Sequence, residues 1–478
     1  MLQLAPFEPD KASFNPTASE LSVNALPVAD GWGPMPLLID FSEALPAPCV
    51  GAAYVRNSDG GFFLIAGTQT NLYRLTGITW TEISGPSAPY SVPDADRWQF
   101  ARYGNRLIAT ALGSPPQFLD VDAGTDFADL PNAPEAKYVC VAGDFVVFGY
   151  LANLPYTLQW SGLNDSEFFT VGERGSDIQL LPDGDEVTGV FGTPLGAAVF
   201  QRNAMREMAF NPASGYTFTI SVAHPTRGAV APLSIVQVGP GDFEFLCTDG
   251  FFRGWGMNVV PIGVERVDKW FFGSIDVTDL SIVRGVADPF EKIVWYQYPN
   301  TDGGYTLLGH KWSLDRWCTA DNAGVTELVS IVTQAATIDS IDETIDSVDV
   351  PIDSRLFAGG APIFAGFTTD NILAIFDGAP RAATLATAEI EHAAPRRAFV
   401  NGARVYGDTI SFTLKVGKRD YLGGPKTFTA DIAPSSVTGL VPLRASARLH
   451  QYIVTVAQSA SWSNFVGIEP NAQPEGDR

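Results

Sequence analysis

Short apolar runs interrupted by turns recur along this chain at a nearly constant interval. The clearest example is Val139–Gly149, in which Gly143 and Asp144 separate two apolar runs. Successive turn centres are 45, 39, 49, 47, 49 and 82 residues apart. These centres are Asp59, Gly104, Gly143, Gly192, Gly239, Asp288 and Asp370. A period of about 40–50 residues, each containing a small group of strands, is typical of a β-propeller blade.

Composition agrees with a fold built from strands rather than helices. The 478 residues include 46 Gly and 34 Pro, which would interrupt long helices, and 12% aromatic residues, which favour strands. One blade cannot bury both of its faces, whereas a closed ring of blades can. The sequence therefore predicts an all-β fold with a β-propeller-like body of six or seven blades. The alternative is a set of β-sandwiches that do not close into a ring.

Changes in composition and residue pattern along the chain predict three segments. Residues 1–35 are Pro-rich and aperiodic, and they indicate an extended N-terminal arm that lies on another surface. Residues 36–387 contain the repeat and form the predicted propeller-like body, with an acidic insertion at 337–354. Residues 388–478 contain alternating strand-like stretches separated by turn signals. This last segment predicts a separate C-terminal β-sandwich domain.

Charge is unevenly distributed between these segments. The chain carries a net charge of −23, yet residues 391–478 contain ten basic and seven acidic residues. A protein that grips nucleic acid non-specifically needs a surplus of Lys and Arg, so tight DNA binding is not expected. The N-terminus lacks the pattern of a secretory signal, and no apolar run reaches the length of a membrane helix. We therefore expect a protein that is made in a cytoplasm, stays soluble and spans no membrane.

The one low-complexity segment is the acidic insertion, whose Ile and Asp residues share a 3,4,3,4 spacing. That spacing fits an amphipathic helix, but the β-branched residues and Pro351 favour an extended surface loop. In a ring, its carboxylates would form either an acidic channel lining that repels DNA or a rim. The candidate channel or rim residues are Asp339, Asp342, Glu343, Asp346, Asp349 and Asp353.

Motifs for catalysis or metal binding were sought without success. The sequence contains no CxxC pair, no HExxH, no GxSxG elbow and no GxxxxGK[ST] loop. The histidines and cysteines are too dispersed to form a local site: His224, His310, His392, His450, Cys49, Cys140, Cys247 and Cys318. The sequence thus predicts a protein that is not an enzyme and that holds no cofactor or metal.

Three acidic turns resemble parts of functional motifs. Asp120–Asp126 resembles part of a calcium loop but lacks the bidentate Glu. Pro182–Glu186 could place two carboxylates together, and Asn57–Gly61 resembles the Asp-box of sialidase propellers without its spacing. Each is most simply a turn that uses Asp and Gly for their backbone freedom.

Several longer runs are similar to a known protein family. Together they resemble the tail nozzle, or packaged-DNA-stabilising, proteins of short-tailed double-stranded DNA bacteriophages. The resemblance covers nearly the whole chain, but no catalytic motif anchors it. The runs are Val23–Trp32, Trp160–Thr170, Gly175–Gly189, Phe200–Arg206, Cys247–Gly254, Pro261–Phe272, the Ile-Asp-Ser repeat before Leu356–Gly360, and Trp462–Gly467.

The resemblance implies a structural virion protein. In that family six subunits form a ring that closes the distal end of the tail, retains packaged DNA and passes it during ejection. The ring contacts head-to-tail connector or adaptor proteins and tail fibres or spikes. The implied location is the virion tail, after assembly in the host cytoplasm. Two other hypotheses remain open, namely a receptor-binding or glycan-binding (even glycan-cleaving) propeller and a host scaffold propeller with protein partners.

Overall fold

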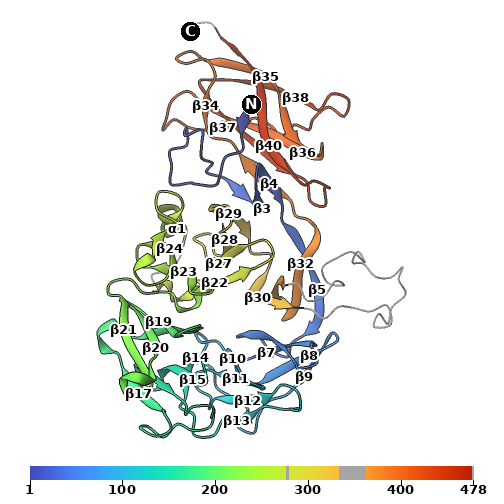
Figure 1. Cartoon of the computed structure of the whole chain (residues 1–478). Helices are drawn as coiled ribbons and strands as arrows, with labels where there is room; N and C mark the ends of the chain where they lie inside the picture. Colours follow the sequence, from blue (N-terminus) through green and yellow to red (C-terminus); the bar gives the residue numbers. More distant parts are fainter. Residues whose placement is uncertain (276–278, 333–361, 476–478) are drawn as a thin grey trace.

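The structure, a computed structural model, describes residues 1–275, 279–332 and 362–475. Strands dominate it, and the described residues contain a single α-helix, α1 (Asp268–Ser274). A ring of four-stranded sheets forms one body, and a two-sheet sandwich lies at one end of it (Figure 1). The expected all-β fold with a propeller-like body and a C-terminal sandwich is therefore confirmed.

In the described residues, seven blades of four antiparallel strands form the ring, and the four strands of blade 6 belong to a larger sheet. Blades 1 to 6 each use four strands that are consecutive in the chain. Blade 1 has β6 (Ala52–Arg56), β7 (Phe62–Gly67), β8 (Leu72–Thr76) and β9 (Thr79–Glu82); blade 2 has β10 (Gln99–Tyr103), β11 (Arg106–Thr110), β12 (Gln117–Asp120) and β13 (Ala128–Asp129); blade 3 has β14 (Ala136–Ala142), β15 (Phe145–Leu151), β16 (Leu154–Trp160) and β17 (Asp177–Leu180). Blade 4 has β18 (Val187–Thr193), β19 (Gly196–Gln201), β20 (Met205–Phe210) and β21 (Phe218–His224); blade 5 has β22 (Val236–Gly239), β23 (Asp242–Cys247), β24 (Gly250–Gly254) and β25 (Val260–Pro261); blade 6 has β26 (Arg284–Asp288), β27 (Ile293–Pro299), β28 (Tyr305–Lys311) and β29 (Arg316–Asp321).

Blade 7 closes the ring with strands from both ends of the body. It contains β30 (Val325–Val332), β31 (Pro362–Thr368) and β32 (Ile372–Pro380), and its fourth strand is β5 (Pro36–Ala44). β5 pairs antiparallel with β32, with Ile39 opposite Ile375. The first strands of blades 7 and 1, β30 and β6, are also in contact. Closure therefore uses backbone hydrogen bonds between segments more than 300 residues apart, which leaves no open end in the ring.

Most hydrophobic clusters of the body lie between neighbouring blades, and one cluster extends from blades 5, 6 and 7 into the sandwich. Val147 and Val199 belong to the cluster between blades 3 and 4, and Phe200 and Phe245 belong to the one between blades 4 and 5. The middle strands consequently have apolar residues on both faces, as in the fully buried run Phe145–Phe148. Because a blade offers two faces and no core of its own, each blade depends on both neighbours.

The turn markers of the sequence analysis correspond to one position in the blade. In blades 1 to 6 they fall at, or a few residues from, the turn between the first and second strands. Gly192 was misplaced as a turn centre, because it lies within β18, paired with Ala197. Asp370 belongs to the next turn of its blade, between β31 and β32. The last interval is longer than the others because of this shift and because the residues between Val332 and Pro362, which include the acidic insertion, lie within it.

The sandwich packs two sheets against each other. One sheet has the order β3-β4-β40-β35-β38, and β1 also pairs with β40; the other contains β33, β39, β36 and β37, with β34 beside β39. Along β38 buried and exposed residues alternate, so that Val441, Leu443 and Ala445 face the core. The strands are β1 (Leu2–Gln3), β3 (Ala25–Val28), β4 (Gly31–Pro34), β33 (Ala383–Ala386), β34 (Ile390–Glu391), β35 (Ala398–Gly407), β36 (Phe412–Arg419), β37 (Thr427–Phe428), β38 (Leu440–Ala447), β39 (Leu449–Val456) and β40 (Phe465–Pro474).

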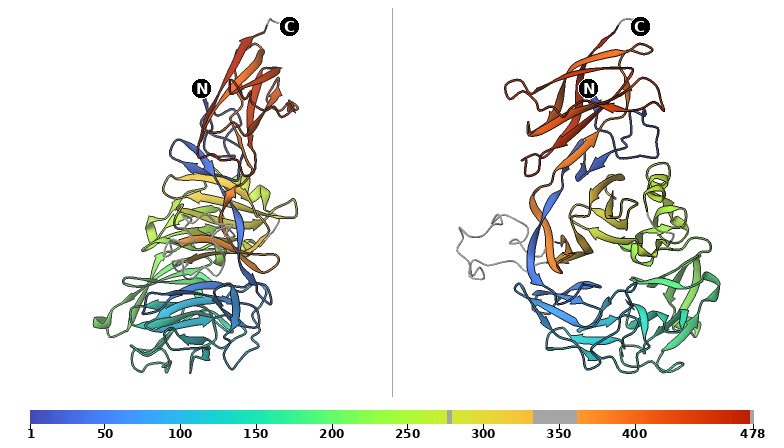
Figure 2. Two further views of the ribbon diagram at one scale, coloured as in Figure 1. Left: turned by 90° about the vertical axis from the view of Figure 1, so that its right-hand side faces the viewer. Right: turned by 180° about the vertical axis from the view of Figure 1, so that it is seen from behind.

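One short strand joins the two bodies into a single sheet. β2 (Ser22–Val23) pairs in parallel with β29 of blade 6 and antiparallel with β33 of the sandwich. The result is a ten-stranded sheet that runs from the propeller into the sandwich. The β5–β32 ribbon makes a second crossing beside it (Figure 2).

Residues 1–35, for which an extended arm was expected, lie along both bodies of this same chain. Their strands pair within the sandwich and with blade 6. The Asp10 carboxylate accepts hydrogen bonds from the backbone N–H groups of Lys269 (2.8 Å) and Trp270 (2.7 Å) at the start of α1. Phe7 packs edge-on against Trp270, with ring centroids 5.3 Å apart. This segment thereby links α1 to the sandwich.

Candidate functional site

A cavity of about 320 Å³ lies on the axis of the propeller. All seven blades contribute to its wall through their first strands or the loops that precede them. Representative lining residues, one per blade, are Ala53, Phe100, Tyr138, Val190, Ile235, Val286 and Val329. The wall has residues from the whole ring, so a site here exists only when the ring is closed.

Two arginines and one glutamate meet beside this cavity. Arg97 Nε and Arg284 Nη1 donate to the same oxygen of Glu327, Oε2, at 3.0 and 2.8 Å. The exposed fractions of Arg97 and Glu327 are 7% and 9%. Burial lowers the pKa of the Arg284 guanidinium, although the Glu327 carboxylate opposes that shift. This triad joins blades 2, 6 and 7 through charge-assisted hydrogen bonds.

A second cavity, polar and also about 320 Å³, lies beside the first strands of blades 3 and 4. Its lining includes Tyr138, Tyr150, Glu186 and Arg202. Arg202 Nη1 lies 2.9 Å from Glu186 Oε1, and the Lys137 ammonium lies 5.3 Å from the centroid of the Tyr150 ring. The walls thus present an aromatic ring next to paired charges.

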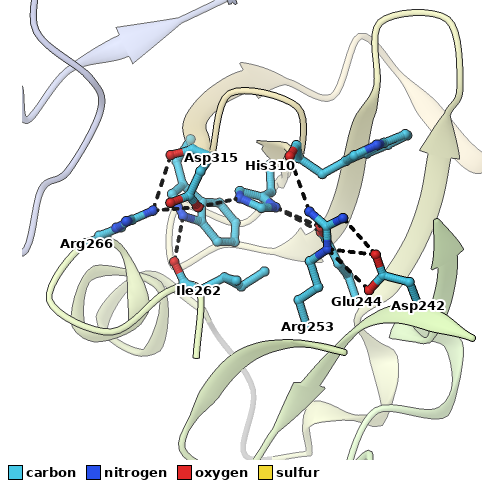
Figure 3. A network of polar contacts seen from close by, with 9 residues as sticks. Asp242, Glu244, Arg253, Ile262, Arg266, His310 and Asp315 are labelled. Carbon is cyan, nitrogen blue, oxygen red and sulfur yellow. Dashed lines mark hydrogen bonds and ion pairs between the residues drawn. The ribbon is translucent and has the colours of Figure 1, made fainter. Parts of the chain in front are cut away.

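A buried polar network connects blades 5 and 6 (Figure 3). His310, on β28, places Nδ1 3.0 Å from both carboxylate oxygens of Glu244, on β23. Its Nε2 lies 3.3 Å from Asp315 Oδ1, and Arg266 Nη1 lies 2.7 Å from the same oxygen. Arg253 pairs with Asp242 at 2.7 Å on the blade 5 side. Glu244 and His310 are 0% and 1% exposed.

The geometry of this network favours the protonated form of His310. Burial by itself would lower the pKa of His310, but hydrogen bonds to Asp315 and Glu244 outweigh it and raise the pKa. Asp315 has its pKa lowered by the His310 hydrogen bond and by Arg266. With a carboxylate at each ring nitrogen, His310 lacks the free nitrogen that a general base requires. The network is suited to clamping two blades together.

The acidic residues singled out from the sequence lie outside the described residues. They are Asp339, Asp342, Glu343, Asp346, Asp349 and Asp353, and their placement on a channel or a rim stays a prediction. In the described ranges, no three His, Cys, Asp or Glu residues are placed to hold a metal ion. No helix of these ranges is long and apolar enough to cross a membrane.

The three acidic turns have local roles in the structure. Asp120 Oδ1 accepts hydrogen bonds from Asn105 Nδ2 (2.8 Å) and from the backbone of Ala123 (2.9 Å), which organises the turn after β12. Asp183 forms an ion pair with Arg206, and that pair lowers the pKa of Asp183. The turn at Asn57–Gly61 connects β6 to β7. All four cysteines are buried free thiols.

Sequence reasoning missed both charged clusters. Arg97, Arg284 and Glu327 are far apart in the chain, and no local motif links them. One available signal was the polar residue at the start of an otherwise apolar first strand, as at Arg284 and Glu327. Such a position faces the axis only once the blades are closed into a ring.

No family model matches the chain, and a search of curated proteins gives no match. Among solved structures, the chain is similar to the extracellular domain of a putative hybrid two-component system from B. thetaiotaomicron. That match has 11% identity and a TM-score of 0.40, and it covers 79% of this chain but only 44% of the other. The chain is also similar to the WD40 domain of Pan2 from Neurospora crassa. That match has 10% identity and a TM-score of 0.38, and it covers 73% of this chain and 96% of the other. The blade assignment above rests on the strand pairing within this chain.

Proposed function

We propose that this protein is a structural component of a virion tail, a hexameric nozzle that closes the distal end of the tail channel. It retains packaged DNA and passes it during ejection. The observation that carries the proposal is the coupling of the two bodies through the ten-stranded sheet and residues 1–35. A protomer of this kind transmits load between neighbours without a hinge between its domains.

The charge distribution supports assembly into a ring. Residues 391–478 carry a net charge of +3, and the remainder of the chain carries −26. A ring requires a head-to-tail contact in which two different surfaces of each subunit meet. A contact between the acidic propeller and a C-terminal region without negative excess avoids the repulsion that two acidic propellers would experience. Surfaces outside these subunit contacts are available to connector or adaptor proteins and to tail fibres or spikes.

The acidic propeller suits a path along which DNA moves without adhering. Several arginines of the propeller are paired with carboxylates, as in Arg106 with Glu167 (2.6 Å) and Arg253 with Asp242 (2.7 Å). A protein binds DNA phosphates non-specifically through lysine and arginine side chains, which displace the counterions of the DNA. We expect the purified ring to show no salt-dependent affinity for duplex DNA above the level of a neutral control protein.

Electron microscopy of particles that contain this chain tests the proposal directly. We expect a six-fold ring with a central channel at the distal end of the tail. Immunogold labelling with an antibody against the sandwich provides the location. A protein that stays monomeric when isolated from mature particles, or that is absent from them, contradicts the proposal.

A receptor-binding or glycan-cleaving tail propeller is the second candidate. The polar cavity with Tyr150, Glu186 and Arg202 favours it, because sugars require an aromatic surface together with paired hydrogen-bonding groups. A glycan array and a polysaccharide depolymerisation assay with the purified chain distinguish the candidates. Array binding that is lost in Tyr150→Ala, with the ring intact, would favour the receptor hypothesis.

A further inference from the structure

The Arg97–Glu327–Arg284 triad holds more positive than negative charge. Its two guanidinium groups share one oxygen of one carboxylate. The other acidic side chains that act on Arg284 are the Tyr305 phenol and the Cys49 thiol rather than carboxylates. Burial raises the pKa of the Cys49 thiol, so that thiol supplies no compensating charge. One positive charge of the triad is therefore left without a buried counter-charge.

Neighbouring aspartates do not remove this excess. The Asp96 carboxylate pairs with Lys137, and Asp96 and Arg97 are joined through the Asp96 backbone carbonyl (2.7 Å). Asp94 is exposed at the rim, where its carboxylate accepts a hydrogen bond from Gln69 Nε2. A carboxylate at an exposed rim is screened by water and acts weakly on a buried cation.

A third cavity, of about 390 Å³, opens on the far side of the two arginines. Arg97 and Arg284 line both this cavity and the axial one, whereas Glu327 lines only the axial one. A ligand that enters from this side meets both guanidinium groups before the carboxylate. Tyr305, Asn322 and Thr369 add polar groups to the wall, and the exposed Asp94 adds its carboxylate. The volume is in the range of small-ligand sites.

We propose that this third cavity, the axial-mouth cavity, binds a small oxyanion, a carboxylate or phosphate group, between Arg97 and Arg284. Guanidinium groups bind such anions with paired charge-assisted hydrogen bonds, and a bound anion neutralises the excess buried charge. The site goes beyond a structural role in the tail, because it gives the propeller a chemically defined ligand.

Isothermal titration of the full chain tests the site with two probes, sodium phosphate and sodium glucuronate, at matched ionic strength with sodium chloride as the blank. We expect saturable binding of at least one probe. Phosphate alone would identify a phosphate group as the ligand chemistry, and glucuronate alone would identify the carboxylate of an acidic sugar. The absence of saturable binding for both probes would overturn the proposal.

Variants separate the site from non-specific attraction. Arg284→Gln should weaken binding by at least about tenfold, because it removes a charged donor but keeps an amide. The matched control Arg404→Gln removes an exposed arginine of the sandwich and should leave affinity unchanged. Equal affinities of wild type and Arg284→Gln would overturn the proposal.

A variant that is expected to bind more tightly tests the site independently of folding defects, because a misfolded protein would not gain affinity. Asp94→Asn removes a like charge from the rim without altering the backbone carbonyl that Arg97 contacts at 2.9 Å. We expect this variant to bind the probe more tightly, by about twofold to fivefold. Asp165→Asn on blade 3 is the distant control and should show no gain. Unchanged or weaker binding in Asp94→Asn would argue against an anion in this cavity.

Discussion

Two buried histidines, one in the propeller and one in the sandwich, occupy opposite electrostatic settings. His310 lies between Glu244 and Asp315, and its pKa is raised by them in spite of burial. His450 is 0% exposed and has its pKa lowered to about 4, first by burial and then by the nearby His392, Lys418 and Arg397. The surroundings therefore favour the charged form of this residue type in one body and the neutral form in the other.

This contrast shows how each body obtains its cohesion. The propeller must align separate blades, and paired charges between blades define one register because a misaligned blade leaves a buried charge unpaired. The sandwich consists of two sheets facing one core, where alternating apolar residues already define the register. The following predictions test that contrast, starting with the largest expected effect.

Removal of the Glu244 carboxylate, which is buried between blades 5 and 6, should cause the largest loss of unfolding free energy. Glu244→Ala leaves the His310 imidazolium with one of its two carboxylates, and we expect a loss of about 3–5 kcal/mol in unfolding free energy. Urea unfolding followed by hydrogen exchange of β23 and β28 peptides measures it. The matched control is Glu291→Ala, which breaks a partly exposed pair with Lys311 and should cost about 1 kcal/mol or less. Equal losses in the two variants would contradict the proposal that the His310 network holds blades 5 and 6 together.

As the pH falls, the sandwich should lose stability while the contact between blades 5 and 6 keeps its stability. A histidine with a lowered pKa stabilises the fold fully above the unfolded pKa of 6.5, and this contribution is lost as the pH falls toward about 4. We expect β39 protection factors to decrease over that range by an amount worth roughly 3 kcal/mol at most. His310, with its raised pKa, is already protonated there, so β28 protection should hold. His450→Gln should abolish the response of β39, and a response that persists would contradict the assignment.

Weakening the β2 junction between the propeller and the sandwich should cause an intermediate loss of stability. Asn24 has φ = 57° and donates from Nδ2 to Asp321 (2.7 Å) and to the Ala382 carbonyl (3.0 Å). Asn24→Ala loses these bonds and disfavours the left-handed backbone, at a cost of about 1–3 kcal/mol. Scanning calorimetry should then resolve separate transitions for the two bodies. The exposed Asn401→Ala should keep the wild-type profile, and an identical profile in Asn24→Ala would mean that β2 does not couple the bodies.

A surface ion pair of the sandwich should matter least. Arg397 Nη1 lies 2.8 Å from Asp420 Oδ2, and both side chains are more than one-third exposed. Asp420→Asn should change the unfolding free energy by less than about 1 kcal/mol, because water and salt screen the pair. Thermal unfolding at low and high salt measures the change. A loss as large as that of Glu244→Ala would remove the distinction between buried and exposed pairs.

Periodicity predicted the propeller better than it predicted individual turns. The recurring interval was sufficient for a ring of six or seven blades because every blade repeats the same strand–turn unit. It was insufficient to place the turn near Gly192 correctly, since glycine also occurs inside strands such as β18. The fourth strand of the seventh blade could not be recognised from local sequence, because this strand, β5, precedes the first blade in the chain.

The candidate site was beyond local prediction for a related reason. Hydrophobic alternation specifies which side of a strand is buried, but it does not specify which polar groups of other blades lie there. Arg97, Arg284 and Glu327 meet only because the loop before β10 and the first strands of blades 6 and 7 converge on one axis. The same holds for Glu244 and His310, which are 66 residues apart.

The sequence by itself determined an all-β, repeat-built, acidic chain with a near-neutral C-terminal region, because composition and periodicity are local properties. Tertiary structure alone decided the number of blades, the closure through β5, the joining of propeller and sandwich by β2, and the convergence of charge at the axis. Those features depend on backbone pairing and burial between segments hundreds of residues apart, and these long-range contacts leave no periodic trace in the sequence.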